Sequence, residues 1–132
     1  MTLSEYACHF IGVDYQWGGD SVEEGYDCSG FIQEVLSSKG LDPKGDQTAQ
    51  ALYNHFIAKG KKNALPSEES LLFFGKSKDK ITHVALALNG HQMIEAGGEG
   101  RVSTTKGMVR IRPISNRNDL IAAIEIPVWH TR

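Results

Sequence analysis

One cysteine of the chain stands where a nucleophile would be activated. Cys28 follows Asp27 and precedes an apolar-periodic segment, residues 31–36, that runs toward Gly40. This order predicts a helix with Asp27 as the N-cap, the cysteine in the first turn and Gly40 at the C-terminal stop. A helix N-terminus carries unpaired N–H groups and a partial positive charge, so a thiol there is stabilised as the thiolate. Cys28 is therefore the candidate nucleophile.

A cysteine nucleophile needs a base close by, usually a histidine from another part of the chain. His83 stands out because of the strand predicted over residues 81–88. Alternation along this strand puts His83 on one face with Ala85 and Ala87, two small side chains that leave space around the imidazole. Taken alone, the strand equally allows a hydrogen-bonded histidine in the core. The side chains predicted to face the core are Thr82, Val84, Leu86 and Leu88.

The length of the loop between this strand and the next, predicted over residues 92–96, decides which residue orients His83. A two-residue Asn-Gly turn would bury Glu95 without a partner on the core face, at a cost of several kcal/mol. A loop of three or five residues would instead put Glu95 opposite Ala85, on the face of His83 and one diagonal step away. The burial cost outweighs the turn preference, so we predict the longer loop, with Glu95 orienting the imidazole. His91, at the loop tip, is the weaker candidate for this role.

A metal site is an alternative interpretation of the same residues, with ligands Cys28, His83, His91 and Glu95. Closed structural zinc sites usually contain closely spaced ligand pairs such as C-x-x-C, and the chain has no such pair. We therefore expect no metal and no cofactor. A disulfide between the two cysteines, Cys8 and Cys28, is also disfavoured, because two cysteines alone make no disulfide framework.

The elements that would position these residues follow a helices-first order. Helical patterns cover residues 2–12, 28–40 and 48–57. Strand patterns follow at residues 71–74, 81–88, 92–96, 109–112 and 120–128. This order is typical of an α+β fold in which N-terminal helices pack on an antiparallel β-sheet, and it predicts a single domain over residues 1–132. The remaining predictions are an irregular loop over residues 13–27 and a solvated surface at Lys59, Lys61 and Lys62.

The composition is that of an ordinary globular protein, with 40% hydrophobic and 23% charged residues. A net charge of −2 gives no electrostatic footprint for nucleic acid or for an anionic membrane, so neither is an expected partner. No apolar segment approaches the roughly 20 residues that span a bilayer. The N-terminus lacks the basic and apolar regions of a signal peptide, so we expect a protein that is cytoplasmic as synthesised.

Five segments of the chain form an ordered set of motifs. They are Tyr15-Gln16-Trp17-Gly18-Gly19, Asp27-Cys28-Ser29-Gly30-Phe31, Leu72-Phe73-Phe74, Ile81-Thr82-His83-Val84 and the hairpin at 88–96. In this order they resemble the NlpC-type cell-wall cysteine peptidases of the papain-like superfamily, over most of the chain. The resemblance implies a papain-like α+β fold with Cys28 as nucleophile and His83 as base. It also implies that the Tyr15 hydroxyl and the Cys28 backbone N–H donate to the oxyanion.

By the same resemblance, the substrates are peptidoglycan (murein) stem peptides, cleaved between D-glutamate and a diamino acid such as diaminopimelate. The Cys28 thiolate would attack the amide carbonyl, His83 would protonate the leaving amine, and water would hydrolyse the thioester. Asp27, Ser29 and Trp17 are the candidate substrate-binding residues. The loop context of Trp17 alone favours a packing role over a stacking platform.

Three positions depart from the family pattern. Glu95 replaces a third polar residue that is most often histidine, Glu69-Ser70 replaces Gly-Asp before the first strand, and Ala85 replaces a glycine. A carboxylate is able to orient an imidazole, so the predicted triad keeps its third member. The departures also motivate a second hypothesis, a non-catalytic structural or binding module of the same fold, such as a phage tail component. A third is an acyltransferase that uses the same Cys-His pair.

Three biological settings fit a wall-active enzyme without a leader or a wall-binding module. They are a phage particle, an effector exported by a leaderless route, and a cytosolic recycling enzyme. A peptidoglycan peptide is the expected substrate partner in each. An effector would also have an inhibitory, immunity-type protein partner.

Overall fold

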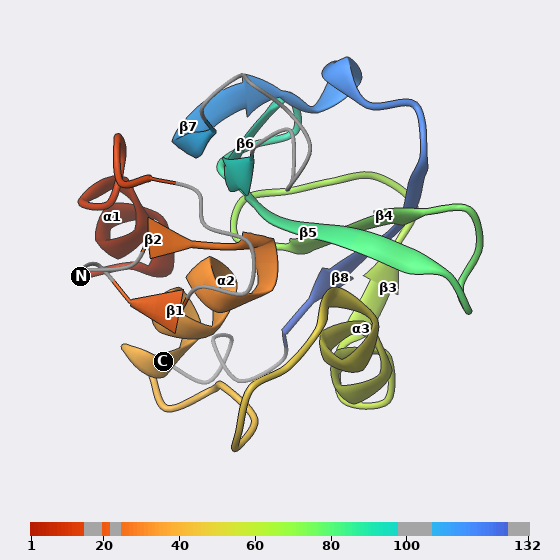
Figure 1. The fold of residues 1–132 in the computed structure, drawn as a ribbon. Helices are drawn as coiled ribbons and strands as arrows, with labels where there is room; N and C mark the ends of the chain where they lie inside the picture. Colours follow the sequence, from red (N-terminus) through yellow and green to blue (C-terminus); the bar gives the residue numbers. More distant parts are fainter. Residues whose placement is uncertain (15–19, 22–24, 98–106, 127–132) are drawn as a thin grey trace.

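The computed structural model describes residues 1–14, 20–21, 25–97 and 107–126 of the chain. Its helices are α1 (Leu3–Cys8), α2 (Cys28–Ser37), α3 (Ala49–Ile57) and a short 3-10 helix η1 (Ile114–Asn116). Its strands are β1 (Asp20–Ser21), β2 (Gly25–Tyr26), β3 (Lys61–Asn63), β4 (Leu71–Gly75), β5 (Ile81–Ala87), β6 (Gln92–Gly97), β7 (Met108–Pro113) and β8 (Leu120–Glu125). Six strands form an antiparallel sheet in the order β3-β8-β4-β5-β6-β7, and β1 pairs with β2 (Figure 1). The predicted α+β class is confirmed.

Each of the three α-helices begins at a side chain that caps it. The N-caps are Thr2, Asp27 and Thr48, and each accepts a hydrogen bond from a backbone N–H in the first turn. The first helix is shorter than predicted because the chain turns away to pair with β7, where the N–H of Gly12 donates to the Val109 carbonyl at 2.9 Å. The second helix ends at Ser37, and Gly40 adopts a φ of 68° in the turn that follows.

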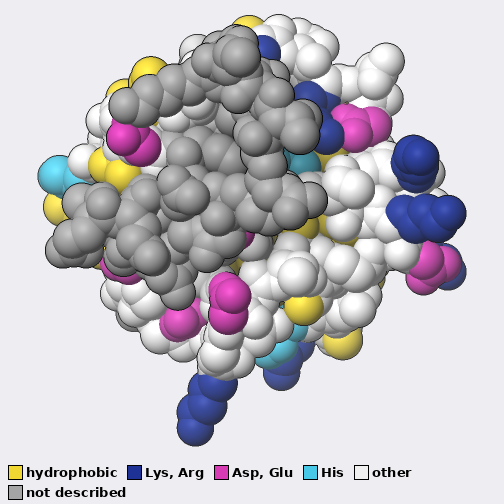
Figure 2. All heavy atoms as spheres, in the orientation of Figure 1, with side chains coloured by type: hydrophobic (Ala, Val, Ile, Leu, Met, Phe, Trp, Pro, Cys, Tyr) yellow, Lys and Arg dark blue, Asp and Glu magenta, His cyan; other side chains and the backbone are white. Residues whose placement is uncertain are grey.

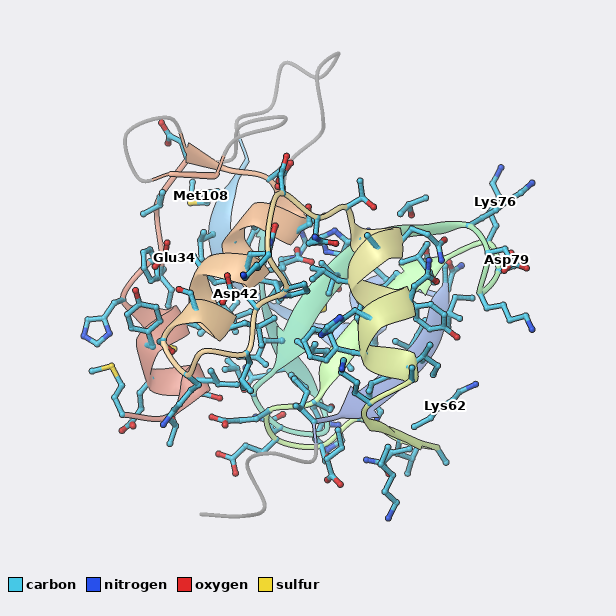
Figure 3. The ribbon with its side chains drawn as sticks, turned by 90° about the horizontal axis from the view of Figure 1, so that it is seen from below. Glu34, Asp42, Lys62, Lys76, Asp79 and Met108 are labelled. Atoms are coloured by element: carbon cyan, nitrogen blue, oxygen red, sulfur yellow. The ribbon has the colours of Figure 1, made fainter. Side chains whose placement is uncertain are left out.

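Both faces of the sheet are buried. On one face, α2 and α3 lie side by side across the strands (Figure 3). Their apolar side chains pack against Leu71, Phe73, Val84, Leu86 and Ile94. The other face carries a smaller apolar cluster of Leu72, Phe74, Ala85, Ala87, Met93, Ile114 and Ala123. The space predicted beside the two alanines of β5 is therefore filled by apolar side chains.

One residue predicted to face the core lies on the surface. Thr82 is exposed, because the pairing of β4 with β5 shifts after Phe74. Gly75 then faces Ile81, and one residue of β5 is left over as a bulge. Ile81 takes the buried place and joins the helix-side core. A bulge of this kind has no signature in the alternation of the strand itself.

The hairpin from β5 to β6 has the longer loop that the burial argument predicts. The N–H of Leu88 donates to the Gln92 carbonyl at 2.9 Å, which leaves residues 89–91 as a three-residue loop. The side-chain oxygen of Asn89 accepts from the backbone N–H groups of His91 and Gln92, both at 2.8 Å. The asparagine thus satisfies the loop amides itself and does not form a two-residue turn.

Three short strands go beyond the sequence prediction. β3 forms one edge of the sheet by pairing with β8, and its exposed residues Lys61 and Lys62 are typical of an edge strand. β1 and β2 lie within the segment predicted as an irregular loop. Strands of two or three residues are too short for alternation to reveal them. The end of the last predicted strand, residues 127–128, lies outside the described residues.

Charged side chains of both signs share the surface around the turn between β4 and β5. Figure 2 shows lysine and arginine side chains on that side of the molecule, with carboxylates beside them. Figure 3 places Lys76 and Asp79 together at this turn. Among the described residues, no helix has both the length and the apolar character that crossing a membrane requires.

Glu69, just before β4, adopts the left-handed conformation with a φ of 65°. This conformation costs a residue with a side chain about 1–2 kcal/mol, and glycine is the residue that the family resemblance expects here. The Glu69 carboxylate compensates in part by accepting a hydrogen bond from the N–H of Ser4 at 2.9 Å.

We expect Glu69→Gly to be more stable than Glu69→Ala by about 1 kcal/mol. Both variants lack the carboxylate, so they differ mainly in how well residue 69 tolerates a positive φ. Urea unfolding of the two variants measures the difference. Equal free energies of unfolding would contradict the assignment of backbone strain to this position.

Candidate active site

Cys28 is the first residue of α2, and Asp27 caps the helix as predicted. The Asp27 carboxylate accepts a hydrogen bond from the N–H of Gly30 at 2.7 Å and one from the Ser29 hydroxyl at 3.3 Å. The cap fixes the first turn and therefore the direction in which the thiol points. Asp27 and Ser29 thus contact each other, and their binding of a substrate stays a prediction.

The side chains of Cys28, His83 and Glu95 form one row, with the imidazole in the middle. On one side, the imidazole of His83 is close enough to the side chain of Cys28 for this residue to raise the pKa of the ring. On the other side, its Nε2–H donates to Oε1 of Glu95 at 2.7 Å. Since Nε2 is hydrogen-bonded to the carboxylate, Nδ1 is the ring nitrogen available to interact with the sulfur. The imidazole and the carboxylate are shielded from water, because His83 is 9% and Glu95 only 3% exposed, whereas Cys28 is partly exposed.

His83 and Glu95 lie where β5 and β6 separate. The last paired residues of the two strands are Leu86 with Ile94, so the ladder stops before it reaches the triad. β6 continues to pair with β7 as far as Gly97, and α2 packs against both β5 and β6. The imidazole–carboxylate bond therefore bridges two diverging strands beneath the helix that carries the cysteine.

Burial acts against the charged form of His83 and by itself would lower its pKa. The hydrogen bonds with Cys28 and Glu95, and then the negative charges of these two groups, outweigh burial and raise the pKa of His83 to about 9. Burial would likewise raise the pKa of Glu95, but its hydrogen bond and charge interaction with His83, followed by Arg110, hold that pKa below its usual value. At neutral pH these shifts favour the imidazolium form of His83 and the carboxylate form of Glu95.

The raised pKa of His83 makes part of the stability depend on pH. Protonated His83 stabilises the fold fully below its ordinary value of 6.5, and this contribution is lost as the pH rises through about 9. We expect the free energy of unfolding to fall by up to about 3 kcal/mol across this window. Urea unfolding at both ends of the window measures the fall, with His83→Gln as the control that lacks the titrating group. An equal fall in the variant would contradict the prediction.

Arg110 is a member of the site that the sequence analysis missed. It lies directly opposite Glu95 on β7, and its Nε donates to Oε2 of Glu95 at 3.3 Å. The alternation of residues 109–112 places Arg110 on the face opposite Val109, which was the available signal. The pairing register of β6 with β7 was needed to connect it to Glu95. Residues 98–106, between these strands, gave no basis for that register.

His91 does not take part in the triad. It lies in the exposed loop between β5 and β6, where its carbonyl accepts from the N–H of Ile114 at 2.9 Å. Glu95, and not His91, is the partner of His83. Within the described part of the chain, no group of three or more His, Cys, Asp or Glu side chains is arranged to hold a metal ion. Cys8 and Cys28 are both free thiols.

Two predicted site residues, Tyr15 and Trp17, lie outside the described residues. The role of the Tyr15 hydroxyl at an oxyanion and the contact of Trp17 with substrate therefore stay predictions. The backbone N–H of Cys28 belongs to the first turn of α2, whose amides have no acceptor within the helix. That amide is thus positioned on an element able to stabilise a negative oxygen.

The sequence profile of the NlpC/P60 family matches residues 12–118. The bifunctional muramidase/DL-endopeptidase CwlT of Bacillus subtilis is 30% identical over 101 residues, which cover 75% of this chain and 30% of that protein. The gamma-D-glutamyl-L-lysine dipeptidyl-peptidase of the same organism is 33% identical over 94 residues, covering 70% of this chain and 30% of that protein. The chain thus spans less than a third of the length of these two relatives.

A solved structure shows the same fold. The NlpC/p60 domain of the peptidoglycan hydrolase SagA superimposes with a TM-score of 0.74 at 28% sequence identity. The match covers 95% of this chain and 97% of that domain.

Proposed function

Since the chain belongs to the NlpC/P60 family of peptidoglycan hydrolases, we propose that it is a cysteine peptidase that hydrolyses peptidoglycan stem peptides. The observation that carries the proposal is the row of Cys28, His83 and Glu95 at the N-terminus of α2, in which the imidazole interacts with both of the other side chains. A nucleophile, a base and a group that orients the base are the three parts that acyl transfer through a thioester requires.

Each residue of the row has one task in this mechanism. The Cys28 thiolate attacks the amide carbonyl carbon, and the negative charge moves to the carbonyl oxygen near the N–H groups of the first turn of α2. His83 gives its proton to the leaving nitrogen, so the C–N bond breaks and a free amine and a thioester remain. His83, now neutral, takes a proton from water as the water attacks the thioester. The acid product and the imidazolium–thiolate pair result. Glu95 keeps the ring in one tautomer throughout.

The bond we propose as the target joins D-glutamate to a diamino acid. The names of two relatives, a DL-endopeptidase and a gamma-D-glutamyl-L-lysine dipeptidyl-peptidase, support this choice. Asp27, Ser29 and Trp17 remain the proposed contacts to the peptide, and Tyr15 remains the proposed oxyanion donor.

The experiment that tests the function is mass spectrometry of defined stem peptides incubated with the purified protein. A tetrapeptide containing D-glutamate linked to diaminopimelate or lysine should be cut after the glutamate, with release of a free amine. The same peptide with L-glutamate is the matched control and should remain intact. If the D-glutamyl peptides remain intact while Cys28 in the same protein reacts with iodoacetamide faster than a free thiol does, the proposed substrate is contradicted.

Two other functions use the same fold. A non-catalytic binding module is favoured only by the departures at Ala85 and Glu95, and it predicts binding to peptidoglycan without release of amines. An acyltransferase would transfer the acyl group from Cys28 to an amine acceptor instead of water. The mass of the product distinguishes transfer from hydrolysis in the same assay.

A further inference from the structure

We propose that Arg110 is a positioning residue that holds the Glu95 carboxylate in place and balances its charge, so that this glutamate does the work of the family's usual neutral third residue. The inference rests on the proposed function, because it assigns a part to the same triad. Arg110 does not touch the reacting atoms and acts only through Glu95.

The geometry gives each oxygen of Glu95 a separate partner. Oε1 accepts from Nε2 of His83 at 2.7 Å, and Oε2 accepts from Nε of Arg110 at 3.3 Å. The three residues lie on β5, β6 and β7, which are neighbours in the sheet. A carboxylate held at both oxygens has little freedom to rotate, so it presents a fixed acceptor to the imidazole.

The charges along this row alternate in sign. In the reactive state of the proposed mechanism, a thiolate at Cys28, an imidazolium at His83, a carboxylate at Glu95 and a guanidinium at Arg110 sum to zero. Without Arg110 the same buried group would carry one net negative charge, and a buried charge without a partner is strongly unfavourable. A neutral histidine at position 95 would need no such compensation.

The other charged groups around the row do not replace Arg110. Asp119 interacts with the charge of His83, and Arg117 donates two hydrogen bonds to Asp119, of 3.0 and 2.8 Å. The guanidinium of Arg117 lies over the ring of Phe74, which contacts His83. Arg117 and Asp119 thus compensate each other. Among the described residues, Arg110 is the arginine or lysine that contacts Glu95.

Gly97 makes room for this pair. A Cβ atom at position 97 would lie 2.6 Å from Nη2 of Arg110 and 2.7 Å from Oε2 of Glu95. Both distances are shorter than van der Waals contact allows, so a side chain here would push the guanidinium and the carboxylate apart. A substitution of Gly97 thus offers a way to displace the two side chains without removing a charge.

The test measures the rate of Cys28 alkylation by iodoacetamide against pH, in the full chain with Cys8→Ser as background. Cys8 is exposed at the end of α1 and outside the site, so this change leaves one thiol to follow. In Arg110→Met, Glu95 should protonate at higher pH, because the adjacent positive charge is gone. The rise of the alkylation rate at acid pH, called the acid limb, should then move up by about one pH unit. At pH values below this rise, the reaction should be about tenfold slower. Arg110→Lys should recover most of the rate.

A double-mutant cycle shows whether Arg110 acts through Glu95. In a Glu95→Gln background, Arg110→Met should change the alkylation rate by less than about twofold, because no carboxylate is left to hold. The proposal is overturned if the rate losses of Arg110→Met and Glu95→Gln multiply fully in the double variant. It is also overturned if the alkylation profile of Arg110→Met matches that of the Cys8→Ser background protein. If Arg110→Met does not fold, Gly97→Ala replaces it: a displaced acid limb supports the proposal and an unmoved one overturns it.

This readout needs no peptide substrate. If the stem peptides remain uncut but the double-mutant cycle shows coupling between Arg110 and Glu95, the proposed function is wrong and the role of Arg110 is retained. If the unmodified protein hydrolyses the peptides and the alkylation profile of Arg110→Met is unchanged, the proposed function is retained and the role of Arg110 is wrong.

Discussion

Replacing Cys28 with alanine is expected to lower the rate of stem-peptide hydrolysis by at least about 10⁴-fold. The sulfur forms the thioester, and the hydroxyl of Ser29, its neighbour in the first turn of α2, donates a hydrogen bond to Asp27. The loss should appear in kcat, because the substitution leaves the other proposed peptide contacts in place. Since the substitution removes one partly buried sulfur, the free energy of unfolding should change by less than about 2 kcal/mol.

Cys8→Ala is the matched control for this variant. Cys8 is the other free thiol, is exposed, and ends α1 outside the site. Its replacement should leave hydrolysis within about twofold of the unmodified protein. Release of amine by Cys28→Ala at an undiminished rate would show that the cysteine is not the nucleophile.

Replacing His83 with glutamine is expected to lower hydrolysis by on the order of 10³-fold or more. Glutamine still offers an N–H to Glu95, so the contact across the separated strands has a replacement. It has no proton to give to the leaving amine and no positive charge to stabilise the thiolate. Alkylation of Cys28 at pH 6 should therefore slow together with hydrolysis, because a free thiol is almost entirely protonated there.

His91→Gln is the matched control, since His91 lies on the same hairpin in the exposed loop. It should leave both rates within about twofold. If His83→Gln slowed hydrolysis but left alkylation at pH 6 unchanged, the imidazole would be an acid only and not the partner that activates the sulfur.

The sequence was sufficient to predict the positions of those residues for which one local rule dominated. Asp27 before an apolar-periodic segment predicted the cap, and the structure has Asp27 bonded to the first turn of α2. The position of Glu95 followed from an energy comparison, because a buried carboxylate without a partner costs more than a preferred turn gains. The observed three-residue loop agrees with that comparison.

The remaining features depend on contacts between segments that no local pattern connects. The exposure of Thr82 follows from a bulge in its pairing with β4. Arg110 joins the site through a strand register, and β3 exists because β8 returns beside it. The apolar cover over Ala85 and Ala87 comes partly from Ile114, in a helix far along the chain. Each of these features required the assembled sheet.

Activation of the nucleophile depends on the interaction between the sulfur at position 28 and a protonated ring at position 83. Nitrogen NMR of the His83 ring, recorded from pH 5 to 10 in the unmodified protein and in Cys28→Ala, tests it most directly. We predict that both ring nitrogens stay protonated through neutral pH and titrate near pH 9, and that loss of the sulfur moves this titration to lower pH. A ring already neutral at pH 7, with the same titration in both proteins, would contradict the account.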